Sequence, residues 1–180
     1  MGEFINVLVI KHCKEEKARE IIEKKAAASE WGLIPGRCQY KTFNDGVQVL
    51  LNDGCCGYED MPKWLSRKLC CPILLCYIYD GDFWGYDFYE NGKEIDIFCT
   101  VPDYFDDITK KEAAKLSGNS SIIAKYFNVD EESIKNYLRQ WTDAVYEIED
   151  EEKAYEDDGF NIGDAWQMAD FMQKIGFPYE

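Results

Sequence analysis

The spacing of hydrophobic residues changes several times along the first part of the chain and predicts alternating strands and helices. Residues 4–10 are rich in β-branched side chains, which is typical of a strand buried on both faces. From Lys14 to Trp31, apolar residues recur at helical spacing, and oppositely charged residues four apart support a helix. A second strand is predicted from Gly46 to Leu51, followed by a short amphipathic helix from about Glu59 to Cys70.

The clearest pattern is a three-stranded meander, with strands expected at residues 73–79, 83–90 and 93–99. These runs are separated by Asp80-Gly81-Asp82 and by Asn91-Gly92. Asp-Gly and Asn-Gly favour the positive φ angles of tight hairpins, so both sequences predict a reversal of the chain. Because side chains alternate along a strand, Trp84, Tyr86 and Phe88 share one face, which we expect to belong to the core.

The second half of the chain is predicted to be mainly helical. Two short helices are expected, Ser120 to Phe127 with Asn119 as its N-cap, and Glu131 to Trp141 with Asp130 as its N-cap. A last amphipathic helix is expected from about Ile162 to Ile175.

These elements together predict an α+β fold in a single domain. We expect a mainly antiparallel sheet of about five strands, with helices packed on one face and a helical C-terminal part. In this interpretation residues 1–110 form the α+β sheet domain, and residues 111–180 form the helical part that packs on it.

The net charge of the chain argues against some classes of binding partner. The chain has 20 basic and 35 acidic residues, a net charge of −15. Such a surface repels phosphate backbones and anionic lipid headgroups, so we expect binding to neither nucleic acid nor membranes. The longest apolar runs are also far shorter than the roughly 20 residues of a membrane helix, and no secretory signal is recognisable, so we expect a cytoplasmic protein.

The negative charge is concentrated in one acidic tract, residues 143–158, which holds nine acids and one lysine. The tract is interpreted either as a solvated connection or as a patch that steers a basic protein partner. In the second interpretation the acids attract the partner and two tyrosines anchor it. The candidate protein-binding residues are Glu147, Asp150, Glu151, Asp157, Asp158, Tyr146 and Tyr155.

Eight cysteines raise the question of a disulfide framework or a metal site. Their close pairs, Cys55-Cys56 and Cys70-Cys71, are adjacent in the chain, so their side chains diverge instead of converging on a metal ion. We therefore expect reduced, structural thiols, no metal and no cofactor.

Two groups of residues keep an enzymatic function open as an alternative. His12 is the only histidine and lies at the end of the first predicted strand. Asp80, Asp82 and Asp87, with Asp96 on the next strand, are placed where a carboxylate cluster would form. No established catalytic motif accompanies either group, so an enzyme is the second choice.

A further alternative is a DNA-binding helix-turn-helix in residues 123–138. Ala124 stands where that motif wants a small residue, and Asn128 stands where it wants a residue that tolerates the left-handed conformation. The second helix, however, would begin with Asp130, Glu131 and Glu132, whose charges oppose phosphate. We interpret the segment as a packed helical hairpin.

One stretch carries a resemblance to known proteins. The run from Tyr77 to Gly92, YIYDGDFWGYDFYENG, together with Pro102-Asp103-Tyr104-Phe105, resembles a pattern shared by uncharacterised bacterial proteins. Some small acidic proteins of this kind resemble immunity proteins of bacterial polymorphic toxin systems. The resemblance implies a non-enzymatic, protein-binding role, with toxin neutralisation as its most specific form, and it implies no catalytic residue.

Overall fold

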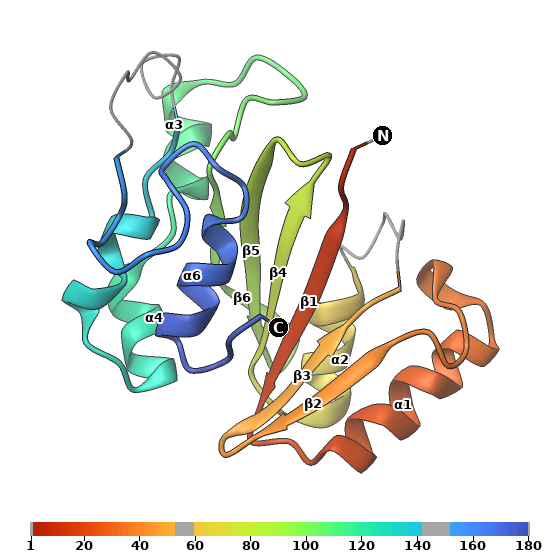
Figure 1. The fold of residues 1–180 in the computed structure, drawn as a ribbon. Helices are drawn as coiled ribbons and strands as arrows, with labels where there is room; N and C mark the ends of the chain where they lie inside the picture. Colours follow the sequence, from red (N-terminus) through yellow and green to blue (C-terminus); the bar gives the residue numbers. More distant parts are fainter. Residues whose placement is uncertain (1, 53–59, 142–151, 180) are drawn as a thin grey trace. The chain divides into compact units, whose positions relative to one another are not determined.

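The computed structural model describes residues 2–52, 60–141 and 152–179, and it confirms an α+β fold with an antiparallel sheet (Figure 1). The sheet has six strands in the order β2-β3-β1-β4-β5-β6. The strands are β1 (Ile5–Lys11), β2 (Gln39–Phe43), β3 (Gly46–Leu50), β4 (Ile73–Tyr79), β5 (Phe83–Glu90) and β6 (Lys93–Cys99). The α-helices in the described residues are α1 (Glu15–Ala27), α2 (Asp60–Leu69), α3 (Lys110–Ala113), α4 (Ser120–Phe127) and α6 (Gln167–Lys174).

The chain divides into two compact units that differ from the expected division at residue 110. We call residues 3–77 and 87–95 the N-terminal unit, and residues 1–2, 78–86 and 96–180 the C-terminal unit. Strands β4, β5 and β6 each contribute residues to both units.

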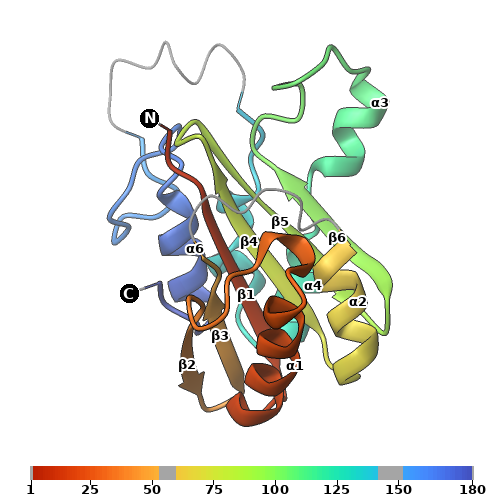
Figure 2. The ribbon, with the colours of Figure 1, turned by 90° about the vertical axis from the view of Figure 1, so that its right-hand side faces the viewer.

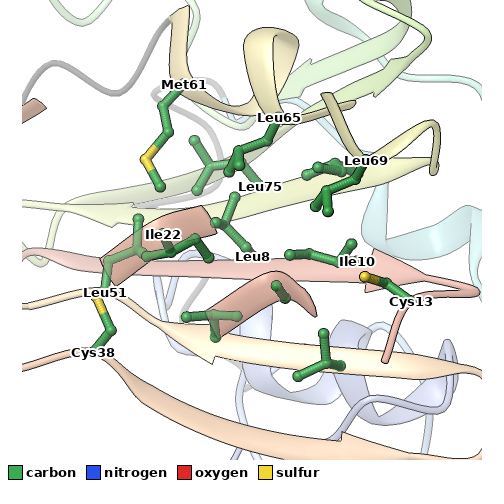
Figure 3. Packing of buried hydrophobic residues seen from close by; sticks show 14 of the residues in the cluster. Leu8, Ile10, Cys13, Ile22, Cys38, Leu51, Met61, Leu65, Leu69 and Leu75 are labelled. Atoms are coloured by element: carbon green, nitrogen blue, oxygen red, sulfur yellow. The ribbon is translucent and has the colours of Figure 1, made fainter. Parts of the chain in front are cut away.

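The N-terminal unit is built around a hydrophobic cluster between two helices and the sheet. Helices α1 and α2 lie side by side in front of the sheet in Figure 2. Ile22 of α1 and Leu65 of α2 point toward Leu8 and Ile10 of β1, and all four side chains are fully buried (Figure 3). Val7 and Val9, which alternate with them, are also fully buried, so β1 is covered on both faces, as its β-branched sequence predicts.

The core of the C-terminal unit is aromatic. Trp84 and Tyr86 of β5 pack on Phe171 of α6, with ring centroids 5.3 and 5.7 Å from it, and Phe98 of β6 lies 5.0 Å from Trp84. The Trp84 indole N–H donates to Gln167 Oε1 at 3.3 Å. Trp84 and Tyr86 are fully buried in this core, and Phe88, which belongs to the N-terminal unit, is fully buried as well, so all three are core residues as expected.

The expected helix from Glu131 to Trp141 is wrong. Two 3₁₀ turns, Glu131–Ser133 and Lys135–Tyr137, stand in its place, although Asp130 caps the first one by accepting from the Glu132 N–H. The Tyr155 hydroxyl takes the position of a helical hydrogen bond: it donates to the Glu132 carbonyl at 2.6 Å and accepts from the Asn136 N–H at 3.1 Å. A distant side chain therefore replaces the bond that would continue a helix.

Two other expected helices are longer than the observed ones. Helix α1 ends at Ala27 because the following turn places Ser29 and Trp31 in the left-handed conformation. Helix α6 begins only at Gln167. Helix α4 matches its expected range, and the Asn119 side chain caps it by accepting from the Ile122 N–H. Within the described residues, no helix is both long and apolar enough to cross a bilayer.

Candidate functional site

Two large hydrophobic side chains of the C-terminal unit are exposed next to each other. Phe105 is 66% exposed and Tyr104 is 38% exposed, and both lie in the loop that follows β6. In the described part of the chain, Ile34 is the other exposed large hydrophobic residue, at 50%. Neighbouring exposed aromatics are typical of binding surfaces, whereas isolated exposed hydrophobics are common on any protein.

The two exposed rings rest on a rigid aromatic support. Tyr79 ends β4 and Phe83 begins β5, and the turn between them is closed by a 2.9 Å hydrogen bond from the Asp82 N–H to the Tyr79 carbonyl. Ring centroids lie 4.7 Å apart for Phe83 and Tyr104, and 5.0 Å apart for Tyr79 and Phe105. We call these four residues the aromatic surface.

Carboxylates surround the aromatic surface in the sequence. Residues 79–83 and 100–109 contain five aspartates and no lysine or arginine. All five are exposed: Asp80, Asp82, Asp103, Asp106 and Asp107. The Tyr104 hydroxyl donates to Asp82 Oδ2 at 2.6 Å, and this hydrogen bond, with burial and the negative charges of Asp82 and Asp80, raises the pKa of Tyr104 to about 12. The contact fixes the Tyr104 ring and joins the loop to the β4–β5 turn.

The described end of the acidic tract is folded against the rest of the C-terminal unit. Asp158 is 5% exposed and accepts hydrogen bonds from the Tyr137 hydroxyl and the Tyr155 N–H. Asp157 forms a 2.9 Å ion pair with Lys174. Burial raises the pKa of Asp158, although both hydrogen bonds act in the opposite direction.

Of the remaining candidates in the acidic tract, the structure describes one and leaves four outside the described residues. Tyr155 is engaged through its hydroxyl with Glu132 and Asn136, as described above. Tyr146, Glu147, Asp150 and Glu151 lie outside the described residues.

His12 belongs to a charged cluster of the N-terminal unit. Its Nδ1 lies 2.7 Å from Asp45 Oδ1, while Asp45 Oδ2 lies 2.6 Å from the Nζ of Lys11, whose side chain is only 3% exposed. Burial raises the pKa of Asp45, but the hydrogen bond and charge of Lys11, with those of His12, outweigh it and hold this pKa below its ordinary value. Asp45 therefore stays ionised and orients the imidazole, with Nε2 as the remaining ring nitrogen.

A solvent-open pocket of about 560 Å³ adjoins this cluster. Its wall includes His12, Cys13, Lys14, Thr42 and Asp45. Sequence analysis missed Asp45 because the strand before it, β2, was not recognised: its side chains are half-buried or exposed and show no clear hydrophobic alternation. The Asn-Asp-Gly run at residues 44–46 was the available signal for the turn.

The meander aspartates do not build a metal site. Asp80 and Asp82 are exposed in the turn, and Asp96 accepts hydrogen bonds from the Tyr86 hydroxyl at 2.6 Å and from the Asn119 N–H at 2.8 Å. Over residues 2–52, 60–141 and 152–179, no group of three or more histidine, cysteine or acidic side chains is arranged to hold a metal ion.

The segment proposed for DNA binding lacks its second helix. The 3₁₀ turns of residues 131–137 replace it, whereas Asn128 adopts the expected left-handed conformation after α4, with φ 55°. The observed segment therefore offers no recognition helix for a DNA groove.

Comparisons with known proteins add no information about function, which is therefore inferred from the arrangements of residues described above. No protein-family model, curated protein or solved structure matches the chain.

Proposed function

We propose that this protein is a non-enzymatic module that binds a basic protein, and that toxin neutralisation, as in immunity proteins, is its specific form. The observation that carries the proposal is the pair of exposed rings, Tyr104 and Phe105, among five exposed aspartates. Interfaces combine a few buried aromatic anchors with a polar rim, and this loop offers both.

The aromatic surface supports binding because it is held in place before a partner arrives. Tyr104 is fixed by Asp82 and by contact with Phe83, so little side-chain freedom remains to be lost on association. Phe105 packs edge-on against Tyr79 while most of its own surface stays in water. Covering Phe105 would therefore remove exposed apolar surface without rearranging the loop.

The charge distribution favours a basic partner over a neutral or acidic one. Five aspartates lie close to the aromatic surface in the sequence, and the whole chain has a net charge of −15. Opposite charge speeds association, and an arginine or lysine of the partner would meet both carboxylates and aromatic ring faces. Glu147, Asp150, Glu151 and Asp157 of the acidic tract remain proposed contributors to the same steering.

The proposal is tested with the full chain as bait and with two matched substitutions. Phe105→Ala removes the more exposed of the two rings, and Ile34→Ala removes an exposed hydrophobic residue that lies far from it in sequence. After capture from a bacterial lysate, the partner is purified and its dissociation constant is measured with each variant. We expect Phe105→Ala to weaken binding by about tenfold or more, and Ile34→Ala to leave it unchanged.

Charge is tested separately through kinetics. The triple variant Asp103→Asn, Asp106→Asn and Asp107→Asn should slow association at low salt and lose this effect at high salt, because exposed charges are screened. Inhibition of the captured partner's toxic activity would establish neutralisation. Failure to capture any basic protein, or equal losses with Phe105→Ala and Ile34→Ala, would contradict the proposal.

A second candidate function rests on the His12–Asp45 pair beside its pocket. A carboxylate that orients a histidine through Nδ1 and leaves Nε2 for proton transfer is an arrangement used in acid–base catalysis. His12→Ala should then abolish turnover of a substrate found by incubating the protein with a metabolite extract, while binding of the captured basic partner stays intact. An extract unchanged by the wild-type protein would eliminate this candidate.

A further inference from the structure

Two cysteines of the N-terminal unit lie in two turns of the chain that are close to each other. Cys13 follows β1 and Cys71 precedes β4, and the Lys11 N–H donates to the Pro72 carbonyl at 3.0 Å beside them. The Sγ of Cys71 lies 3.9 Å from the carbonyl oxygen of His12, the residue before Cys13. We call Cys13 and Cys71 the thiol pair.

The two thiols are close enough to influence each other's titration. Cys13 and Cys71 are each among the causes of the other's pKa shift, and the charge of Lys17 acts on both. Lys17 itself is anchored by donating to the Leu69 carbonyl at 3.4 Å, within the same pair of turns. The turns that carry the two cysteines are held together by the Lys11–Pro72 hydrogen bond, and the Cys71 Sγ lies 3.9 Å from the backbone next to Cys13, so a disulfide needs little backbone movement.

The thiol pair also has a route to solvent. Cys13 lines the pocket of about 560 Å³ beside His12 and Lys14, which is within the size range of small-molecule sites. Cys76, by contrast, is fully buried and has no such access. Cys70 is exposed next to Cys71, so it provides an internal comparison for an accessible thiol outside the pair.

We propose that Cys13 and Cys71 form a reversible disulfide by exchange with a low-molecular-weight disulfide, such as glutathione disulfide, that enters through this pocket. The Cys13 thiolate attacks one sulfur of glutathione disulfide, which gives a mixed disulfide and releases one glutathione thiolate. The Cys71 thiolate then attacks the Cys13 sulfur and releases the second glutathione. The two protons lost by the cysteines pass to the two released thiolates. Two protein thiols are thus oxidised, and one glutathione disulfide is reduced to two glutathiones.

Burial sets the pace of this exchange. It raises the pKa of Cys13 to about 11, with a further rise from the neighbouring Cys71, while Lys17 acts in the opposite direction. Little thiolate is present at neutral pH, so the exchange is slow, and the thiols stay reduced when glutathione is mostly in its reduced form.

The disulfide would connect two strained turns. His12 and Cys70, each directly before one of the paired cysteines, both adopt the left-handed conformation, with φ of 55° and 54°. A disulfide between Cys13 and Cys71 would fix these two turns and reduce the conformational entropy of the unfolded chain. Oxidised protein should therefore unfold at a higher denaturant concentration than reduced protein.

The test incubates the full chain with glutathione disulfide, traps remaining thiols by alkylation and maps peptides by mass spectrometry. We expect a peptide joining Cys13 to Cys71, two glutathiones released for each cross-link, and full reversal by excess reduced glutathione. Cys13→Ser and Cys71→Ser should each abolish the cross-link and the shift in the unfolding midpoint. Cys76→Ser and Cys70→Ser should leave both unchanged.

Three results would overturn the proposal. The first is a stable mixed disulfide on Cys13 without a cross-link to Cys71. The second is a cross-link that disappears in Cys70→Ser, which would make Cys70 a bonded partner. The third is a chain whose Cys13 remains alkylatable after prolonged incubation while Cys70 reacts.

Discussion

The backbone N–H of Asn136 donates a 3.1 Å hydrogen bond to the hydroxyl of Tyr155, which lies 19 residues further along the chain. In a continuous helix this N–H would bond to the carbonyl of Glu132, which is the group that the same hydroxyl satisfies from its other side. One phenol oxygen thus separates two backbone groups that would otherwise pair. The 3₁₀ turns of residues 131–137 are stabilised by this tertiary contact and not by the local sequence alone.

Tyr155→Phe should remove this separation. We expect the free energy of unfolding to fall by about 1 kcal/mol, because one hydrogen-bonding group is lost. The Glu132 carbonyl and the Asn136 N–H should then bond to each other, so the far-ultraviolet circular dichroism should gain helical signal. Urea titration and circular dichroism measure the two effects, and an unchanged spectrum would show that the local sequence alone sets the turns.

Substituting Gly118 and Gly36 by alanine distinguishes two causes of destabilisation, a steric clash of the new Cβ and an unfavourable backbone conformation. Both have positive φ, 67° and 71°, but a Cβ on Gly118 would lie 2.7 Å from Tyr86 Oη, whereas a Cβ on Gly36 would meet nothing within 4 Å. Gly36→Ala should therefore lower the free energy of unfolding by about 1–2 kcal/mol, the penalty of the left-handed conformation. Gly118→Ala should lower it by a further 1–3 kcal/mol or so, because the core must shift. Equal losses in chemical denaturation would refute the predicted contact.

Asp45→Asn should destabilise the protein in a pH-dependent way. The carboxylate's pKa is lowered on folding, so its contribution is present above the unfolded pKa of about 3.9 and is lost as the pH falls through the folded pKa. At neutral pH we expect a loss of about 1 kcal/mol, because Lys11 is buried but the Asp45 side chain is 48% exposed and water screens its charge. The difference between the unfolding curves of the two proteins should begin to shrink as the pH falls below about 4 and should disappear below the folded pKa of Asp45. A constant difference at all pH values would contradict the ionic contact.

Asp82→Asn should change the titration of one tyrosine. The hydrogen bond to Asp82 and the nearby negative charge raise the pKa of Tyr104 to about 12. Removing the charge should bring this pKa closer to the ordinary value of about 10. Ultraviolet difference titration of the variant against wild type, with Tyr104→Phe as the control that identifies the residue, measures the shift. Identical titration curves for wild type and Asp82→Asn would rule out the contact.

Trp84→Ala should be among the most destabilising single changes in the C-terminal unit. The indole is fully buried against Phe98 and Phe171, so its truncation leaves a large cavity. We expect the free energy of unfolding to fall by about 3–5 kcal/mol. A denaturation midpoint close to that of wild type would mean that Trp84 is not part of the core.

Local patterns predicted the elements whose signals are local. The meander strands coincide with β4, β5 and β6, because their turns carry Asp-Gly and Asn-Gly where Asp80, Gly81, Asn91 and Gly92 adopt positive φ. Strand β2 was missed because its side chains are only partly buried and give no apolar alternation. The helix expected after Asp130 failed for the opposite reason: its local signal was good, but Tyr155 competes for its backbone.

The candidate site was less accessible to sequence reasoning than the fold. Tyr104 and Phe105 belong to a run that was noticed for its resemblance to other proteins, but hydrophobic residues in a loop give no sign of whether other side chains cover them. The acidic tract had the stronger sequence signal, yet its described residues Asp157 and Asp158 form contacts within the C-terminal unit. Exposure depends on the folded arrangement, and net charge along the sequence does not reveal it.

The contact between Trp84 and Gln167 also has a consequence for synthesis of the protein. Its two residues are 83 positions apart, so at about 5–20 residues per second a ribosome adds Gln167 roughly 4–17 s after Trp84. During that interval the nascent chain carries the Trp84 and Tyr86 rings before the helix that covers them has been made. The β4–β5–β6 segment therefore exposes apolar surface during synthesis, which is the kind of surface that chaperones of nascent chains bind, however stable the finished protein is.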